Sequence, residues 1–219
     1  MKKIIFFCVF NLLLFNAYSD SLDNRIAAFW NFVSNNERNL FNINSPESPL
    51  YMEIYNQIQL IDKNIYVMLS NEIKNNRKDI IITAGGNAQY FDLCDRIVNL
   101  APRLRFLNPI SLFPRLERIE PFIVGNIVFS VEDVRVNLNT NTSSGKIELL
   151  FLLNEPHLSH IRNDSSGYFY SIYMQMLFTM TQQILGERIV GEKIGSGAIA
   201  LVNLVIPSIP LIEIRNNIK

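Results

Sequence analysis

The chain has 219 residues, and its 20 lysines and arginines balance 20 aspartates and glutamates, so the formal net charge is zero. This balance argues against a nucleic-acid binder held by a general positive field. A hydrophobic content of 48% excludes wholesale disorder, and two cysteines exclude both a disulfide scaffold and a four-cysteine zinc site.

Residues 1–19 have the pattern of a secretory signal peptide. Two lysines precede an apolar run, Ile4–Phe15, and Ala17 and Ser19 supply the small residues of a cleavage site. The run is short for a membrane-spanning helix, which needs about 20 apolar residues. We therefore expect a periplasmic or secreted protein whose mature chain begins at Asp20. The alternative is a retained N-terminus that anchors the protein to a membrane.

Two helices are predicted at the start of the mature chain. Apolar residues recur at helical spacing from Leu22 to Leu40, and Ser21 or Asp23 is expected to cap this first helix. A turn with Pro46 separates it from a second helix over residues 49–61.

The pattern then changes to short strands. Residues 65–69 form a short apolar run, and a polar turn is expected from 70 to 78. The β-branched segment 79–84 predicts a buried strand, which Gly85-Gly86-Asn87 ends.

A third helix is predicted around Cys94, the single cysteine left after signal cleavage. Phe91, Cys94 and Ile97 share the apolar face of this helix, which indicates a buried structural cysteine rather than a reactive thiol. The helix should stop before Pro102, and residues 103–113 are expected to be extended.

The second half begins with strands and contains the clearest helix. Strands are predicted over 122–129, 134–138 and 147–153, with a polar hairpin loop at 137–145. Residues 166–185 carry a broad apolar stripe at helical spacing, and Gly186 is suited to end that helix. Extended chain is expected afterwards, with a hairpin turn at Gly195-Ser196-Gly197.

The order of these elements indicates the fold class. Strands come in adjacent pairs rather than in strict βαβ alternation, which argues against a doubly wound parallel sheet. We expect an α+β fold with a mainly antiparallel or mixed sheet. Two N-terminal helices, a central helix and a long helix of the C-terminal half should pack on that sheet. No Pro/Ser/Gly-rich linker interrupts the mature chain, so residues 20–219 are predicted to form a single domain.

Four segments together resemble an uncharacterised bacterial domain of unknown function. They are Ala28-Phe29-Trp30-Asn31-Phe32-Val33, the strand that ends in Thr83-Ala84-Gly85-Gly86-Asn87, Leu100-Ala101-Pro102 and Leu185-Gly186-Glu187. The family pattern has an aromatic N-terminal helix, Thr-Ala-x-Gly-Asn, Ala-Pro and a late Leu-Gly-Glu. An aromatic residue usually follows the Ala-Pro helix, whereas this chain has Phe106 and Leu107 further on. The resemblance implies one domain and brings neither an activity nor functional residues.

The turn Gly85-Gly86-Asn87 is a candidate ligand site. Glycines between a strand and a helix allow close backbone approach, and free N–H groups at a helix start favour an anion. Neither dinucleotide-binding nor P-loop spacing is present. Asn87 is also a suitable helix N-cap, so a purely structural turn is the competing interpretation.

The only two histidines lie together in a predicted polar loop. Glu155, His157, His160 and Asp164 combine imidazole and carboxylate groups, which suit zinc or another transition metal. The H-E-x-x-H motif is absent, and solvated loop histidines are the competing interpretation. Carboxylate pairs such as Glu117 with Glu120 or Glu132 with Asp133 are candidates for acid–base work, although solvated charges are normal at strand ends and turns.

No catalytic constellation emerges from these patterns, and the G-x-S-x-G elbow is absent. The leading hypothesis is therefore an exported, non-enzymatic domain without a cofactor. It would bind a partner protein or an envelope ligand, and no nucleic acid. The alternative is a metal-dependent envelope hydrolase that uses zinc at Glu155, His157, His160 and Asp164. If residues 1–19 are retained, the same domain would be associated with a membrane.

Overall fold

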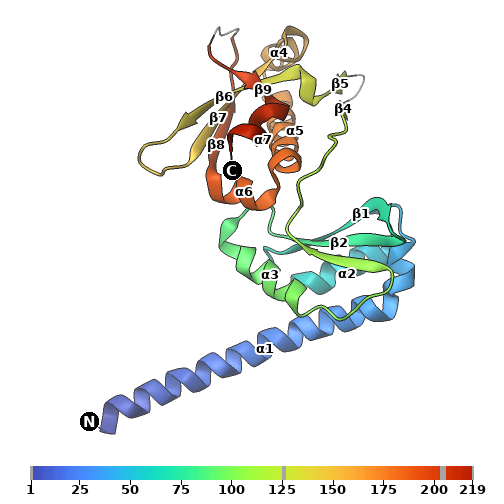
Figure 1. The fold of residues 1–219 in the computed structure, drawn as a ribbon, viewed down its shortest axis with the longest axis vertical. Helices are drawn as coiled ribbons and strands as arrows, with labels where there is room; N and C mark the ends of the chain where they lie inside the picture. Colours follow the sequence, from blue (N-terminus) through green and yellow to red (C-terminus); the bar gives the residue numbers. More distant parts are fainter. Residues whose placement is uncertain (1, 125–126, 203–205, 219) are drawn as a thin grey trace. The chain divides into compact units, whose positions relative to one another are not determined.

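The structure, a computed structural model, describes residues 2–124, 127–202 and 206–218, with the backbone alone for residues 2–21 and Val124. The chain forms two compact units (Figure 1). The first comprises Met1–Gly85 and Gln89–Leu112, and the second comprises Gly86–Ala88 and Phe113–Lys219. Each has its own sheet and its own hydrophobic core. The single domain expected over residues 20–219 stays a prediction.

The first unit packs three helices against one face of a three-stranded sheet (Figure 1). The helices are α1 (Lys2–Phe41), α2 (Pro49–Gln59) and α3 (Phe91–Asn99). The strands are β1 (Tyr66–Lys74), β2 (Arg77–Thr83) and β3 (Leu107–Ser111), in the order β1-β2-β3. The β1–β2 pair is antiparallel and the β2–β3 pair is parallel.

Side chains along a strand point alternately to the two faces of the sheet, and this alternation determines which residues enter the core of the first unit. Ile80 and Ile82 of β2 are fully buried on the face that meets the helices. Trp30 of α1 is 2% exposed, and its indole N–H donates to the carbonyl of Ile97 at 2.7 Å. Cys94 is fully buried in the same core, so the prediction of a buried structural cysteine is confirmed.

Two predictions for the first unit are wrong. The expected turn at 70–78 is strand, because β1 and β2 form a hairpin whose loop is only Asn75-Asn76, both at positive φ. The expected helix cap at Ser21 or Asp23 lies inside α1. Asp23 instead accepts two hydrogen bonds from the guanidinium of Arg96, at 2.9 and 3.0 Å.

The second unit is built around a four-stranded mixed sheet. Its order is β8-β7-β6-β9, from strands β6 (Val134–Thr140), β7 (Ile147–Leu153), β8 (Ile194–Ile199) and β9 (Ile209–Pro210). A separate hairpin pairs β4 (Phe122–Val124) with β5 (Ile127–Phe129). The helices are α4 (Glu155–Arg162), α5 (Tyr168–Leu185), α6 (Glu187–Lys193) and α7 (Ile214–Asn217).

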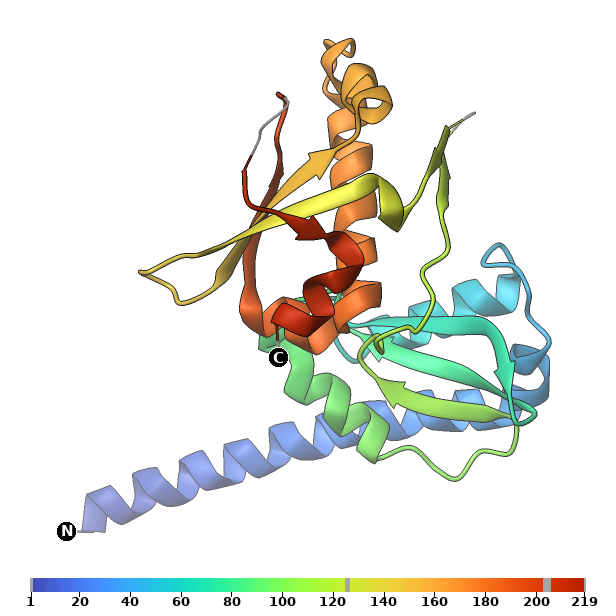
Figure 2. The ribbon, with the colours of Figure 1, turned by 45° about the horizontal axis from the view of Figure 1, so that its top comes forward.

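The long helix α5 supplies much of the second core. Its Leu177 and Met180 are fully buried and pack with Val136 of β6 and Phe151 of β7. Figure 2 shows the β6–β7 hairpin, in yellow, extending beyond the sheet. Val136 and Phe151 are direct register partners on the inner face of the sheet. The next pair along the strands, Arg135 with Leu152, therefore lies on the outer face.

Two irregular segments predicted in the second unit are helices. The loop expected around the histidines is α4, which begins after Asn154 and has Pro156 in its first turn, an arrangement typical of helix starts. The chain expected to be extended after Gly186 is α6, which contains Gly191. The hairpin turn expected at Gly195-Ser196-Gly197 is part of β8, which runs parallel to β7.

The α+β class and the mixed sheets are confirmed. In the part of the chain that the structure describes, no helix has the length and apolar character needed to cross a bilayer. The predicted signal peptide, residues 1–19, lies outside the residues whose side chains are described.

Candidate functional site

The four predicted metal ligands are not brought together. Helix α4 carries Glu155, His157 and His160, and Asp164 follows it. Glu155 accepts hydrogen bonds from Ser159 at 3.1 Å and Arg162 at 2.8 Å. No group of three or more histidine, cysteine, aspartate or glutamate side chains suited to a metal ion occurs among the described residues. The zinc site stays a prediction without geometric support.

Asp164 stabilises the start of α5. Its carboxylate accepts the backbone N–H groups of Ser166 at 2.9 Å and of Phe169 at 2.7 Å. Hydrogen bonding from the Ser166 hydroxyl, together with these backbone donors, lowers the pKa of Asp164 below its ordinary value. This carboxylate therefore satisfies one backbone donor in the first turn of α5, that of Phe169, and one just before the helix, that of Ser166, which is a structural role.

His157 belongs to a polar trio, defined here as Asp133, His157 and Tyr173, of which Asp133 is partly exposed. His157 is 4% exposed and Tyr173 is fully buried. The Nδ1 atom of His157 lies 2.9 Å from the Tyr173 hydroxyl, and its Nε2 atom lies 3.5 Å from a carboxylate oxygen of Asp133. The ring of Phe129 packs edge-on against both aromatic partners, with centroids 4.8 and 5.0 Å away.

The environment of the polar trio determines its protonation. Burial lowers the pKa of His157 below its ordinary value, and the charge of Asp133 opposes this shift only in part. Burial alone would raise the pKa of Asp133. Hydrogen bonds from Ser130 and Asn154 and the nearby His157 reverse that effect, so the net shift is downward. The two ring nitrogens of His157 thus face two different partners, the Tyr173 hydroxyl at Nδ1 and the Asp133 carboxylate at Nε2.

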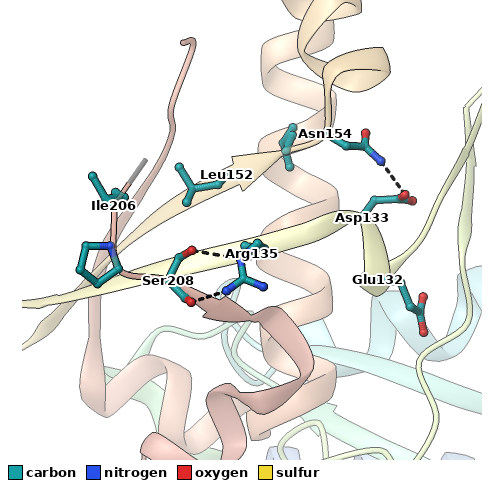
Figure 3. A pocket seen from close by; sticks show the side chains of 9 residues that line it. Glu132, Asp133, Arg135, Leu152, Asn154, Ile206 and Ser208 are labelled. Carbon is teal, nitrogen blue, oxygen red and sulfur yellow. Dashed lines mark hydrogen bonds between the residues drawn. The ribbon is translucent and has the colours of Figure 1, made fainter. Parts of the chain in front are cut away.

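Asp133 also lines a cleft of about 640 Å³ on the outer face of the sheet. Figure 3 shows Arg135 between Ser208 on one side and Asp133 with Glu132 on the other. The side chains that line the cleft are Glu132, Asp133, Arg135, Leu152, Leu153, Asn154, Ile206, Pro207 and Ser208. The lining thus combines one guanidinium and two carboxylates with several apolar side chains. These residues come from the sheet and its neighbouring turns and from the segment before β9.

Hydrogen bonds fix the polar groups of the cleft. The Nε atom of Arg135 donates to the Ser208 hydroxyl at 3.0 Å, and its Nη2 atom donates to the Ser208 carbonyl. Asn154 donates to Asp133 at 2.8 Å instead of capping α4 (Figure 3). The Ser208 hydroxyl faces a guanidinium rather than a base, so its surroundings do not activate it as a nucleophile.

The Gly85-Gly86-Asn87 turn follows β2 as expected, and both glycines have positive φ. Within the second unit, however, the N–H of Gly86 donates to the Glu187 carboxylate at 2.9 Å. The other oxygen of Glu187 accepts the N–H of Phe113 at 2.8 Å, and Glu187 is fully buried. The anion at this turn is therefore a side chain of the same protein. Asn87 precedes a 3₁₀ turn, Ala88–Tyr90, and the N-cap of α3 is Tyr90.

Sequence patterns missed most of this site. Asp133 is a sequence candidate as half of a carboxylate pair with Glu132, Tyr173 is indicated only as part of the apolar face of a helix, and Arg135 has no sequence signal that distinguishes it. An asparagine followed two residues later by proline, as in Asn154 and Pro156, is typical of a helix start. This pair is the local sequence signal that the histidines belong to a helix. Comparisons with protein-family models, with curated proteins and with solved structures found no match for this chain.

Proposed function

We propose that the protein is an exported, non-enzymatic binding module. Its second unit would hold a short peptide, or a ligand of similar zwitterionic character, in the cleft between β6 and the segment 206–208. The observation that carries this proposal is the arrangement of charge in the cleft. A guanidinium and two carboxylates occupy separate parts of one cleft, whose lining also includes apolar side chains (Figure 3).

The lining offers a partner for each of the three parts of such a ligand, which are its carboxylate, its ammonium group and its apolar side chain. Arg135 is exposed, and a guanidinium recognises a carboxylate through two parallel hydrogen bonds. Glu132 is exposed and offers a charge partner for an ammonium group. Leu152 and Ile206 offer apolar surface to a side chain. The cleft volume of about 640 Å³ suits a ligand the size of a short peptide.

Binding is favoured over catalysis because the acid–base groups do not face the cleft freely. His157 and Tyr173 are buried behind Asp133, so a ligand in the cleft would meet only the carboxylate. Asp133 already accepts hydrogen bonds from Ser130 at 2.9 Å and Asn154 at 2.8 Å. Export is supported by the pattern of residues 1–19 alone.

Calorimetric titration with the tripeptide Ala-Leu-Ala tests the proposal. The tripeptide with free termini should bind, and the same tripeptide acetylated and amidated at its ends should bind far more weakly. Arg135→Gln should weaken binding by about tenfold or more, the scale of one charged hydrogen-bonded pair. Arg188→Gln removes an exposed arginine of α6 outside the cleft and should leave the affinity unchanged.

Two results would contradict the proposal. Failure of the free tripeptide to bind would reject a zwitterionic ligand. Equal affinities of the wild type and Arg135→Gln would place binding elsewhere. Thermal unfolding of Arg135→Gln is the accompanying control, because Arg135 also holds Ser208.

A further inference from the structure

The first unit has a basic hollow of about 540 Å³, called here the arginine hollow. It is lined by Arg77, Pro102, Arg103, Leu104 and Arg105. Arg77 begins β2, whereas the other four residues belong to the segment between α3 and β3. The fold thus brings a distant arginine beside Arg103 and Arg105, and the lining contains three guanidinium groups and no carboxylate.

Backbone carbonyls orient the first of these guanidinium groups. The Nε atom of Arg77 donates to the Leu107 carbonyl at 3.2 Å, and Nη2 donates to the Leu104 carbonyl at 3.4 Å. Arg77 is half-buried, so little side-chain freedom remains for a ligand to remove. These bonds to neutral acceptors leave its positive charge without a counterion.

The segment that carries the other two arginines is also fixed. Glu37 of α1 accepts the N–H groups of Phe106 and Leu107, at 2.5 and 3.0 Å. The ring of Phe106 packs on Phe41, with centroids 5.8 Å apart, and the guanidinium carbon of Arg105 lies 5.1 Å from the Phe106 centroid. The loop is therefore held in place, although Arg103 and Arg105 themselves are exposed.

The charge of the hollow is not balanced locally. Among the described residues, no ion pair joins Arg77, Arg103 or Arg105 to a carboxylate. The neighbouring acid, Glu37, accepts two backbone N–H groups and does not line the hollow. Three like charges around one hollow repel each other, and an anion that contacts all three would relieve this repulsion.

We propose that the arginine hollow is a binding site for a phosphate-bearing ligand. Phosphate oxygens match the fork geometry of guanidinium groups, and three arginines together favour a multiply charged group over a single carboxylate. This site lies in the first unit and does not depend on the peptide cleft proposed for the second. The phosphate can belong to a soluble compound or to a lipid headgroup.

Calorimetric titration of the full chain with inorganic pyrophosphate tests the site. Wild-type protein should bind pyrophosphate, with an affinity that falls as salt is raised because exposed charges are screened. The double variant Arg103→Gln/Arg105→Gln should weaken binding at least tenfold. Neither side chain forms a hydrogen bond among the described residues, so this variant should fold. Arg118→Gln, an exposed arginine that is ion-paired with Glu120, is the matched control and should bind like wild type.

A second arm separates the two sources of phosphate. Sedimentation with phosphatidylcholine vesicles, with and without phosphatidylglycerol, measures binding to a lipid headgroup. Pyrophosphate binding without vesicle binding indicates a soluble ligand. Binding only to the phosphatidylglycerol vesicles indicates a lipid, provided that the double variant loses it. Failure to bind either probe, or equal binding by the wild type and the double variant, would overturn the proposal.

Discussion

The imidazole of His157 lies where it cannot easily take a proton. Burial holds its pKa below the ordinary value of 6.5, and Asp133 and Tyr173 satisfy both ring nitrogens. As the pH falls below 6.5, the unfolded chain binds a proton at this residue more readily than the folded chain does. The free energy of unfolding should therefore decrease as the pH is lowered from 6.5. This decrease should end when the pH reaches the lowered pKa of His157 in the folded state.

Thermal unfolding between about pH 7.5 and about pH 5 tests this prediction. The wild type should lose melting temperature as the pH falls, and His157→Gln should lose less over the same range. Identical slopes for wild type and His157→Gln would contradict a role for the buried imidazole. Asp133 should reduce the free energy of unfolding further only at more acidic pH. Its pKa in the folded state lies below 3.8, so the unfolded chain binds this proton first as the pH falls.

Glu187 is the second residue with a sharp expected effect. Its two carboxylate oxygens accept the N–H groups of Gly86 and Phe113 in a fully buried position. Glu187→Gln keeps the size but turns one acceptor into a donor, so one buried N–H loses its partner. We expect the free energy of unfolding to fall by about 1–3 kcal/mol.

Urea unfolding of paired variants checks this expectation. Glu192→Gln is the matched control, because this glutamate lies on the same helix but is exposed, and its ion pair with Arg188 is 3.7 Å long. An exposed pair of this kind contributes less than about 1 kcal/mol. Equal effects of the two substitutions would show that the Glu187 hydrogen bonds do not stabilise the fold.

At the level of elements, the hairpin of β1 and β2 depends on its two-residue turn. Asn75 and Asn76 have φ values of 51° and 58°, the left-handed conformation that asparagine tolerates better than most residues. Asn76→Ala should reduce the free energy of unfolding by about 1 kcal/mol, since alanine meets the full steric cost of this conformation. Asn71→Ala, at an exposed position within β1, is the control for asparagine removal.

Urea unfolding of both variants, with the same dependence of the free energy of unfolding on urea concentration, would measure this difference in stability as a shift of the midpoint. If Asn71→Ala and Asn76→Ala shift the midpoint equally, the turn conformation does not limit the stability of the hairpin.

The elements that sequence analysis predicted correctly are those with a long, regular pattern. The helical stripe on α5 and the continuous β-branched run of β2 are both buried, so local pattern alone indicates these two elements. The short helices α4 and α6 have too few turns for a stripe, and tertiary packing of residues such as His157 and Val190 stabilises them. The strand β8 has the glycine and serine content of a turn, but pairing with β7 makes it a strand.

The candidate site was less predictable because it depends on long-range contacts. Asp133 and His157 come from different elements, and the cleft joins β6 to residues 206–208. The arginine hollow likewise needs the β2–β3 pairing that brings Arg77 near residues 103–105. Local sequence patterns carry no information about such pairs.

At the scale of the whole molecule, the fate of residues 1–19 decides where both proposed sites act. Intact-mass measurement of protein purified from its native compartment should give a chain without these residues, because the segment has a cleavage pattern. A full-length mass would instead support a membrane anchor.

Metal analysis of the same sample tests the alternative hydrolase. We expect no stoichiometric zinc, because Glu155 and Asp164 have other partners. Stoichiometric zinc that disappears in His157→Ala would contradict this expectation and support the hydrolase.

The hydrogen bond between Gly86 and Glu187 spans 101 residues, and that between Phe113 and Glu187 spans 74. During synthesis the turn at Gly86 emerges long before its acceptor does, so the second unit cannot close until most of the chain has left the ribosome. Contacts of such long range also slow folding, because a large loop must be ordered before the contact forms.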